Sequence, residues 1–210
     1  MNGLLGKKLG MTQVYDDGGR RVAVTVLEVG PCTVTQLKSA DADGYDAIQL
    51  GYGDARERCV SKPRLGHLKK AGSAPKRWLK EFANDSDEEV KAGDTVTSKI
   101  FDGVSHVDVT SVSKGRGFQG VVKRHKMAGG RMTHGGHSKR RPGAIGQCAY
   151  PARVAKGQRM PGHMGARTVT TQNLRVVQVD HDENLLFLSG SVPGPTGGMV
   201  TVRKALKKRV

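Results

Sequence analysis

The sequence predicts a mainly β protein, with an antiparallel barrel or sandwich. One long basic loop leaves this β-domain and returns to it. Short stretches rich in Val, Leu and Thr alternate with turns containing Gly, Pro or Asp along much of the chain. No acidic residue lies between Asp108 and Asp180. Strand-like stretches occur on both sides of this interval, so the basic stretch is internal to one β-domain.

The N-terminal quarter of the chain is predicted to be a series of short strands. Turn signals separate them: Asp-Asp-Gly-Gly at 16–19, Gly30-Pro31 and Asp43-Gly44. Tyr45, Ala47 or Ile48, and Leu50 are candidates to face a core. The strands expected here span residues 11–15, 21–29, 33–37 and 45–50.

Residues 54–92 are predicted to form a small α-containing insertion. Within it, residues 75–82 (PKRWLKEF) are expected as a short helix, in which Trp78 and Phe82 lie four apart on one face. This spacing favours a core position for Trp78 over a base-stacking platform. The acidic tract 85–89 is expected to be a solvated loop.

Strand signals return at residue 95. Residues 96–101 and 104–112 flank Asp102-Gly103 and are predicted to pair as a hairpin. Three further strands are expected after the basic stretch, at 169–179, 185–188 and 199–202. We therefore expect a body made of residues 1–112 and 168–210, and an extended loop made of residues 113–167.

The charge of the molecule is concentrated in this loop and its flanks. Residues 110–179 contain 14 Lys and Arg, whereas the whole chain has 35 basic and 19 acidic residues and a formal net charge of +16. Gly and Pro recur every few positions there, and the apolar residues follow no period that would build a core. Loops this long are usually functional or disordered, and this one is expected to become ordered on neutralisation by phosphates. A polyanion is the expected partner.

Nucleic acid fits this field better than an anionic membrane, because the chain has neither an amphipathic helix nor a basic cluster beside an apolar anchor. Only two aromatic residues, Phe118 and Tyr150, lie in the loop. The loop is therefore expected to recognise the shape and backbone of a nucleic acid, not a series of stacked bases. A free-standing architectural protein that binds DNA or RNA is the alternative to a defined RNA site.

Three motifs in the loop partly match other kinds of site, but each lacks a required feature. Residues 115–120 match G-x-G-x-x-G, but no acidic residue follows about 20 positions later, as a dinucleotide site requires. His134, His137, Cys148 and His163 lack the paired spacings of a zinc site. Cys148 with a nearby His lacks an acidic residue in the loop to orient that base. We therefore expect no cofactor, no metal and no enzymatic activity; a nucleotide- or metal-dependent enzyme is the third hypothesis.

Because no targeting signal is recognised in the sequence, a cytoplasmic location is expected. No run of about 18 apolar residues is present, and the apolar part of the N-terminal segment is too short for a signal peptide. The three cysteines, Cys32, Cys59 and Cys148, are odd in number and far apart, which does not predict a disulfide framework and fits a reducing compartment.

Several long motifs occur in order along essentially the whole chain. They are Gly3 to Tyr15 (GLLGKKLGMTQVY), Val29 to Cys32 (VGPC), Asp43 to Tyr52 (DGYDAIQLGY), Ser113 to Gly117 with Gln119-Gly120, Arg141 to Gln147 (RPGAIGQ), Arg159 to Gly165 (RMPGHMG) and Thr170 to Leu174 (TTQNL). By these motifs the chain resembles the bacterial family of large-subunit ribosomal protein L3.

The resemblance implies a translation-factor-type β-barrel with a small α-containing insertion and a long basic internal loop that threads through ribosomal RNA. It also implies an early role in assembly of the large subunit, and a loop tip close to the peptidyl-transferase centre. The implied partners are large-subunit ribosomal RNA and neighbouring ribosomal proteins, with no membrane and no small-molecule substrate. The implied location is the cytoplasmic ribosome.

The loop residues expected to contact RNA carry a cationic, imidazole or amide side chain. They are Lys114, Arg116, Lys123, Arg124, His125, Lys126, Arg131, His134, His137, Lys139, Arg140, Arg141, Gln147, Arg153, Lys156, Arg159, His163 and Arg167. The resemblance places the tip at about residues 142–151, with Gly146, Gln147, Cys148, Ala149 and Tyr150 nearest the catalytic RNA. Some relatives carry a methylated glutamine two positions after the residue matching Gln147. Here Ala149 occupies that place, and the tip Trp of eukaryotic relatives is also absent.

Overall fold

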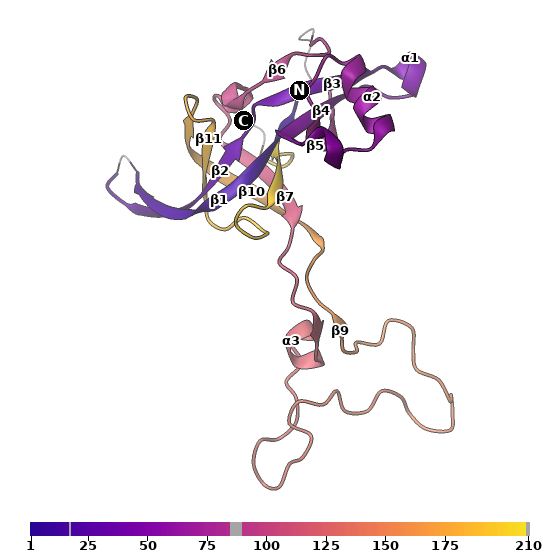
Figure 1. Ribbon diagram of the computed structural model, residues 1–210. Helices are drawn as coiled ribbons and strands as arrows, with labels where there is room; N and C mark the ends of the chain where they lie inside the picture. Colours follow the sequence, from indigo (N-terminus) through magenta and orange to yellow (C-terminus); the bar gives the residue numbers. More distant parts are fainter. Residues whose placement is uncertain (17, 85–89, 209–210) are drawn as a thin grey trace. The chain divides into compact units, whose positions relative to one another are not determined.

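The computed structural model describes residues 1–16, 18–84 and 90–208 (Figure 1). The chain divides into two compact units, which we call the body (residues 1–112 and 168–210) and the loop (residues 113–167). The acidic tract 85–89, expected as a solvated loop, lies outside the described residues. No helix among the described residues is long and apolar enough to cross a membrane.

Six antiparallel strands close into a barrel, which confirms the predicted fold class. In order around the barrel they are β1 (Gly3–Tyr15), β12 (Met199–Lys204), β7 (His106–Val112), β10 (Thr168–Asp180), β11 (Leu185–Ser189) and β2 (Arg21–Val29). Val112 at the end of β7 pairs with Thr168 at the start of β10. The two chain positions that flank the loop are therefore fixed next to each other by the barrel.

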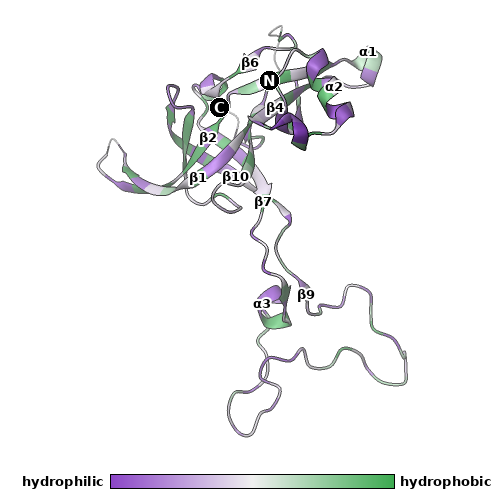
Figure 2. Ribbon diagram, in the orientation of Figure 1, coloured by the Kyte–Doolittle hydropathy of each residue, from purple (hydrophilic) through white to green (hydrophobic). Residues whose placement is uncertain are grey.

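The barrel is filled by aliphatic side chains, as the low aromatic content of 4% requires. These residues have no measurable solvent exposure: Leu4, Leu5, Leu27, Val29, Val107, Val109, Leu186, Leu188, Val200 and Val202. Burial of each such side chain is worth about 1.5–3 kcal/mol. Figure 2 shows the hydrophobic residues on the strands of the body, whereas most of the loop is hydrophilic or neutral.

Four further strands form a second antiparallel sheet beside the barrel core. Their order is β5 (Lys76–Ala83), β4 (Ala47–Asp54), β3 (Cys32–Lys38) and β6 (Thr95–Val96). Ile48, Leu50 and Phe82 from this sheet belong to the same buried cluster as the barrel side chains. Cys32 is also buried there, and burial raises the pKa of its thiol to about 12.

The helix predicted at residues 75–82 is wrong, because this segment is strand β5, paired along its length with β4. Residues four apart share a face in a strand as well as in a helix, so the spacing of Trp78 and Phe82 did not distinguish the two. The core position of Trp78 is confirmed: its ring stacks on Tyr52 with centroids 6.0 Å apart, and it packs against the buried cluster. Among the described residues of this region, an α-helix is present at α2 (Lys62–Lys70), which has Pro63 in its first turn.

The hairpin predicted at residues 96–112 is also wrong. Val96 belongs to β6, which pairs with β3, and Ser98–Phe101 is a short 3-10 helix, η2. The Asp-Gly turn at 102–103 follows this helix, and β7 pairs with β10 and β12 instead. Phe101, predicted as a strand residue, is buried in the core, but it reaches the core from the helical turn η2.

Two short helices complete the body, α1 (Ala40–Asp43) and η1 (Glu57–Cys59). The strand expected from residue 45 begins at Ala47, and Tyr45 is exposed. Ala47, Ile48 and Leu50 are buried, as a core-facing strand requires.

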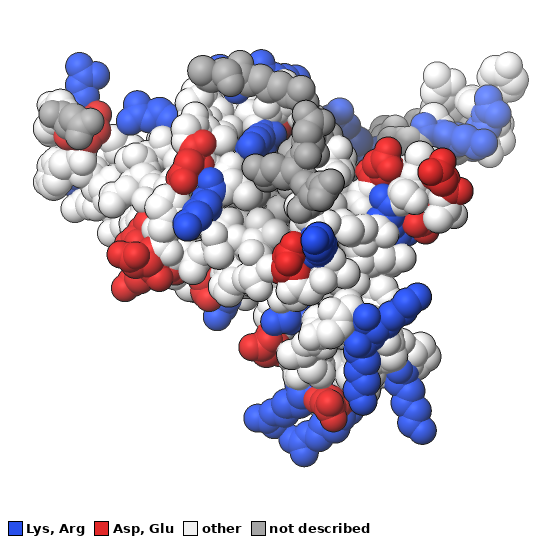
Figure 3. Space-filling model, turned by 90° about the horizontal axis from the view of Figure 1, so that it is seen from above, with Lys and Arg blue, Asp and Glu red and all other residues white. Residues whose placement is uncertain are grey.

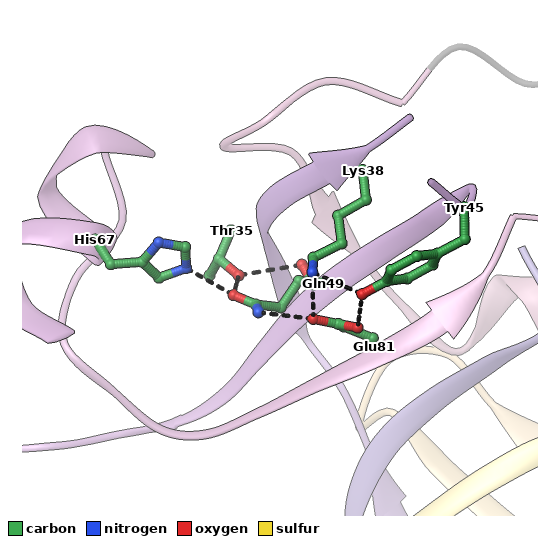
Figure 4. Close-up of polar contacts among 6 residues, drawn as sticks. All are labelled: Thr35, Lys38, Tyr45, Gln49, His67 and Glu81. Atoms are coloured by element: carbon green, nitrogen blue, oxygen red, sulfur yellow. Dashed lines mark hydrogen bonds and ion pairs between the residues drawn. The ribbon is translucent and has the colours of Figure 1, made fainter. Parts of the chain in front are cut away.

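A polar network joins three strands of the second sheet to α2 (Figure 4). The Lys38 ammonium donates to the Tyr45 hydroxyl at 2.6 Å and pairs with Glu81 at 3.3 Å, and the Tyr45 hydroxyl donates to Glu81 at 2.9 Å. Through its bond to Glu81, Tyr45 lowers the pKa of that carboxyl, and Lys38 lowers it further. The oxygen Oε1 of Gln49 accepts from Thr35 at 2.8 Å and lies 2.7 Å from Nε2 of His67 on α2.

Candidate nucleic-acid interface

The two limbs of the loop are held together at their base by main-chain hydrogen bonds. Ser113 N–H donates to Arg167 C=O at 2.8 Å, and Arg116 N–H donates to Met164 C=O at 2.9 Å. Met164 N–H donates in turn to Gly117 C=O at 2.9 Å. The loop thus begins as a paired ribbon, which limits the positions that its side chains can reach.

A two-stranded sheet and a short helix follow this ribbon. Strand β8 (Phe118–Gln119) pairs with β9 (Gly162–His163), and α3 (Val121–His125) comes next in the chain. Arg124 of α3 donates through Nη1 to Met160 C=O at 2.6 Å, and His125 Nε2 lies 3.0 Å from the same oxygen. Both residues, predicted as RNA contacts, are half-buried, and their contacts with Met160 C=O fasten the helix to the opposite limb.

Glycines allow close approach of the main chain further along the loop. Gly130 N–H donates to Lys139 C=O at 3.1 Å, and a Cβ added at Gly130 would lie 2.6 Å from Ser138 O. A Cβ at Gly136 would lie 2.5 Å from Arg131 O. Only glycine fits at these positions, so these two glycines close a smaller turn within the loop.

Most cationic side chains of the loop are exposed to solvent. Of the eighteen residues predicted to contact RNA, all except Arg124 and His125 are exposed. The loop carries 13 Lys and Arg and no Asp or Glu, which leaves the body with 22 basic and 19 acidic residues. Figure 3 shows acidic and basic side chains interspersed over the face of the molecule that it presents. The uncompensated charge therefore belongs to the loop.

The predicted tip residues, Gly146 to Tyr150, are all exposed, and Tyr150 retains 88% of its accessible surface. No Lys or Arg lies between Arg141 and Arg153. The tip is therefore an uncharged segment flanked by arginines, which is chemically distinct from the rest of the loop.

The structure also places the residues of the alternative sites. Among the described residues, no group of three or more His, Cys, Asp or Glu side chains could hold a metal ion. The segment 115–120 leads from β7 into α3, but every strand pair of the described residues is antiparallel, whereas a dinucleotide fold needs parallel βαβ units. Cys148 is a free, exposed thiol.

Comparison with known proteins identifies the family. The family model described as ribosomal protein L3 matches residues 72–187 of this chain. The large ribosomal subunit protein uL3 of Brachyspira hyodysenteriae is 50% identical over 209 residues, which cover 100% of this chain and 96% of the relative. The chain belongs to the ribosomal protein L3 family.

Other members of the L3 family give the same result. The uL3 of Acidothermus cellulolyticus is 53% identical over 208 residues, covering 99% of this chain and 94% of the relative. The uL3 of Alkaliphilus metalliredigens is 48% identical and covers 99% of both chains. As an L3-family member, the chain is a structural constituent of the ribosome and not an enzyme.

Proposed function

We propose that this chain binds large-subunit ribosomal RNA through its loop, supports early assembly of the subunit, and extends the loop tip toward the peptidyl-transferase centre. The observation that carries the proposal is the concentration of 13 exposed or half-exposed cations, without one carboxylate, on a loop with almost no core of its own. Cations in such an arrangement repel one another unless phosphates lie between them. The relatives are named as proteins of the large ribosomal subunit, and the RNA of that subunit is the source of phosphate in this proposal.

The paired base and the tip have different roles in this proposal. The ribbon formed by residues 113–117 and 164–167 directs both limbs, and the exposed Lys and Arg neutralise phosphates along them. The tip has no charge of its own and two neighbouring exposed groups, the Gln147 amide and the Tyr150 ring. Such groups suit contact with bases or with RNA in a crowded centre better than contact with phosphates.

Removal of two adjacent tip-side arginines is expected to weaken and flatten RNA binding. In the variant Arg140→Ala with Arg141→Ala, each lost phosphate contact lowers the slope of log K against log salt by about 0.7–0.9, so the slope should fall by about 1.4–1.8. The measurement is the affinity of the full chain for large-subunit RNA between about 50 and 200 mM salt.

Arg20→Ala with Arg21→Ala provides a matched control, because these arginines are also adjacent and exposed but lie on the β1–β2 hairpin of the body. This variant should keep the affinity and slope of the wild type. If the two double variants weakened RNA binding equally, the loop would not be the RNA-binding element. Competition by arbitrary duplex DNA as effective as that by ribosomal RNA would favour the free-standing nucleic-acid binder.

The base of the loop is expected to tolerate a side chain at one glycine and not at another. Gly117 and Gly165 have φ angles of 64° and 79°, so alanine costs about 1–2 kcal/mol at either. A Cβ at Gly117 meets nothing within 4 Å, whereas one at Gly165 lies 2.2 Å from Lys114 O. Gly165→Ala should therefore separate the limbs and reduce affinity for large-subunit RNA at least about tenfold more than Gly117→Ala. A filter-binding titration of both variants with large-subunit RNA is the measurement. Equal affinities of Gly165→Ala and Gly117→Ala would contradict a preformed base.

A further inference from the structure

In the part of the chain that the structure describes, no strand lies beside one edge of the β1–β2 hairpin. Strand β12 pairs with β1 only from Gly3 to Lys7, and the last main-chain contacts on that side join Lys8 to Gly197 and Gly198. Strand β1 nevertheless continues to Tyr15 and pairs with β2 along its other edge. The hairpin extends away from the barrel at the left of Figure 1. Within the described residues, the outer edge of residues 9–15 has no main-chain partner.

The register shows which groups face this open edge. A bulge between Lys8 and Gly10 shifts the alternation of β1. Beyond it, Asp16 N–H donates to Arg20 C=O at 3.0 Å, so the even-numbered residues direct their peptide groups toward β2. Because the directions alternate, the N–H and C=O groups of Met11, Gln13 and Tyr15 face outward. These groups form a regular row of donors and acceptors spaced for a further strand.

Beyond the bulge, this edge lacks two of the usual protections against pairing, charge and proline. Exposed edge strands normally carry a charge or a proline, particularly Lys. Residues 9–15 read LGMTQVY, with no charge and no proline, in a chain of which 26% is charged. Leu9, Met11 and Tyr15 are also exposed, at 38%, 55% and 70% of their full accessible surface. An uncharged edge with exposed apolar side chains is the composition of a strand-pairing site.

We infer that the open edge of residues 9–15 is a docking site for an extended segment of another protein, which adds a strand to the β1–β2 hairpin. The main-chain row of Met11, Gln13 and Tyr15 supplies the hydrogen bonds, and Met11 and Tyr15 provide contacts for apolar side chains of the added strand. RNA is disfavoured as the occupant, because no Lys or Arg lies between Lys8 and Arg20. The inference takes from the proposed function only the presence of the chain in the large subunit.

Amide hydrogen exchange at single-residue resolution tests the inference directly. The full-length free chain is compared with the same chain in purified, salt-washed large subunits. The amides of Met11, Gln13 and Tyr15 should exchange at least tenfold more slowly in the subunit, whereas Thr12 and Val14, which already bond to β2, should change less. Unchanged exchange at the three outward amides would overturn the inference. Absence of the chain from the subunit fraction would be a failure of the proposed function, seen separately.

Crosslinking then identifies the occupant. A photoreactive phenylalanine derivative is placed at position 11 and, separately, at position 15 of the chain in purified large subunits, and the crosslinked peptides are sequenced. The expected result is attachment from both positions to one protein segment, at sites about four residues apart, as paired strands require. Crosslinks to RNA, or to unrelated segments from the two positions, would overturn a protein strand as the occupant.

A matched pair of proline variants separates edge pairing from hairpin stability. Gln13→Pro removes an outward N–H from the open edge, and Ala23→Pro places the same residue directly opposite on β2, away from that edge. Gln13→Pro should abolish the crosslink from position 11, whereas Ala23→Pro should retain at least half of it. Equal retention in both variants would count against main-chain pairing.

Discussion

Replacement of residues 114–166 by a short linker is expected to release the chain from large ribosomal subunits at salt concentrations that leave the intact chain bound. The replacement removes 12 of the 35 Lys and Arg and no acidic residue. If six to ten of these cations contact phosphates, the affinity they provide falls by about 10³–10⁵ between 50 and 200 mM salt. The shortened chain lacks this contribution, so it should wash off at low salt. Sucrose-gradient sedimentation of cell extracts at increasing salt is the measurement.

The body should survive this replacement. Val112 and Thr168 are paired neighbours in the barrel, so a short linker can join them without strain. A second variant keeps the full length of the loop but carries Gln at its 13 Lys and Arg positions, which separates charge from shape. Both variants should fail to remain with the subunit. Retention of the Gln variant would show that shape holds the loop, and loss of the intact chain to the top of the gradient would contradict the ribosomal RNA site altogether.

The sequence predicted the barrel strands well where apolar and polar residues alternate between clear turn signals. The predicted strands at 169–179, 185–188 and 199–202 agree with β10, β11 and β12 to within one or two residues. Strand β1 was predicted only from residue 11, because Gly3, Gly6 and Gly10 break the apolar alternation of its first half. Residues 76–83 were misassigned because their pairing partner β4 lies more than 20 positions away in the sequence and is not visible in a local pattern.

For the candidate interface too, the sequence predicted features that depend on single residues but not those that depend on contacts between distant residues. Charge is a property of the residues themselves, so the cationic positions of the loop could be predicted one by one. The attachment of Arg124 to Met160 C=O depends on the pairing of two limbs 36 residues apart, which nothing in the sequence specifies. For the same reason the sequence identified the glycines of the loop but not which of them face a carbonyl oxygen at short range.

A single methyl group at Gly6 is expected to destabilise the barrel by about 3 kcal/mol, as overpacking against immovable atoms does. A Cβ at this position would lie 2.4 Å from Glu28 O and 3.1 Å from Val29 Cα, both main-chain atoms of β2. Gly6 is paired with Val29, so β2 cannot move away without loss of the barrel register. Urea unfolding of Gly6→Ala, followed by circular dichroism, should show a lower midpoint with an unchanged slope.

Gly10→Ala makes the same chemical change four residues later in the same strand, where a Cβ would meet nothing within 4 Å. This variant should unfold within about 1 kcal/mol of the wild type, on the stabilising side, because alanine restricts the unfolded chain more than glycine does. The difference between the two variants therefore measures the clash with β2, since composition and strand propensity change equally in both. Equal midpoints would mean that β1 and β2 separate at Gly6 at little cost, and the close approach of these strands would then contribute nothing to stability.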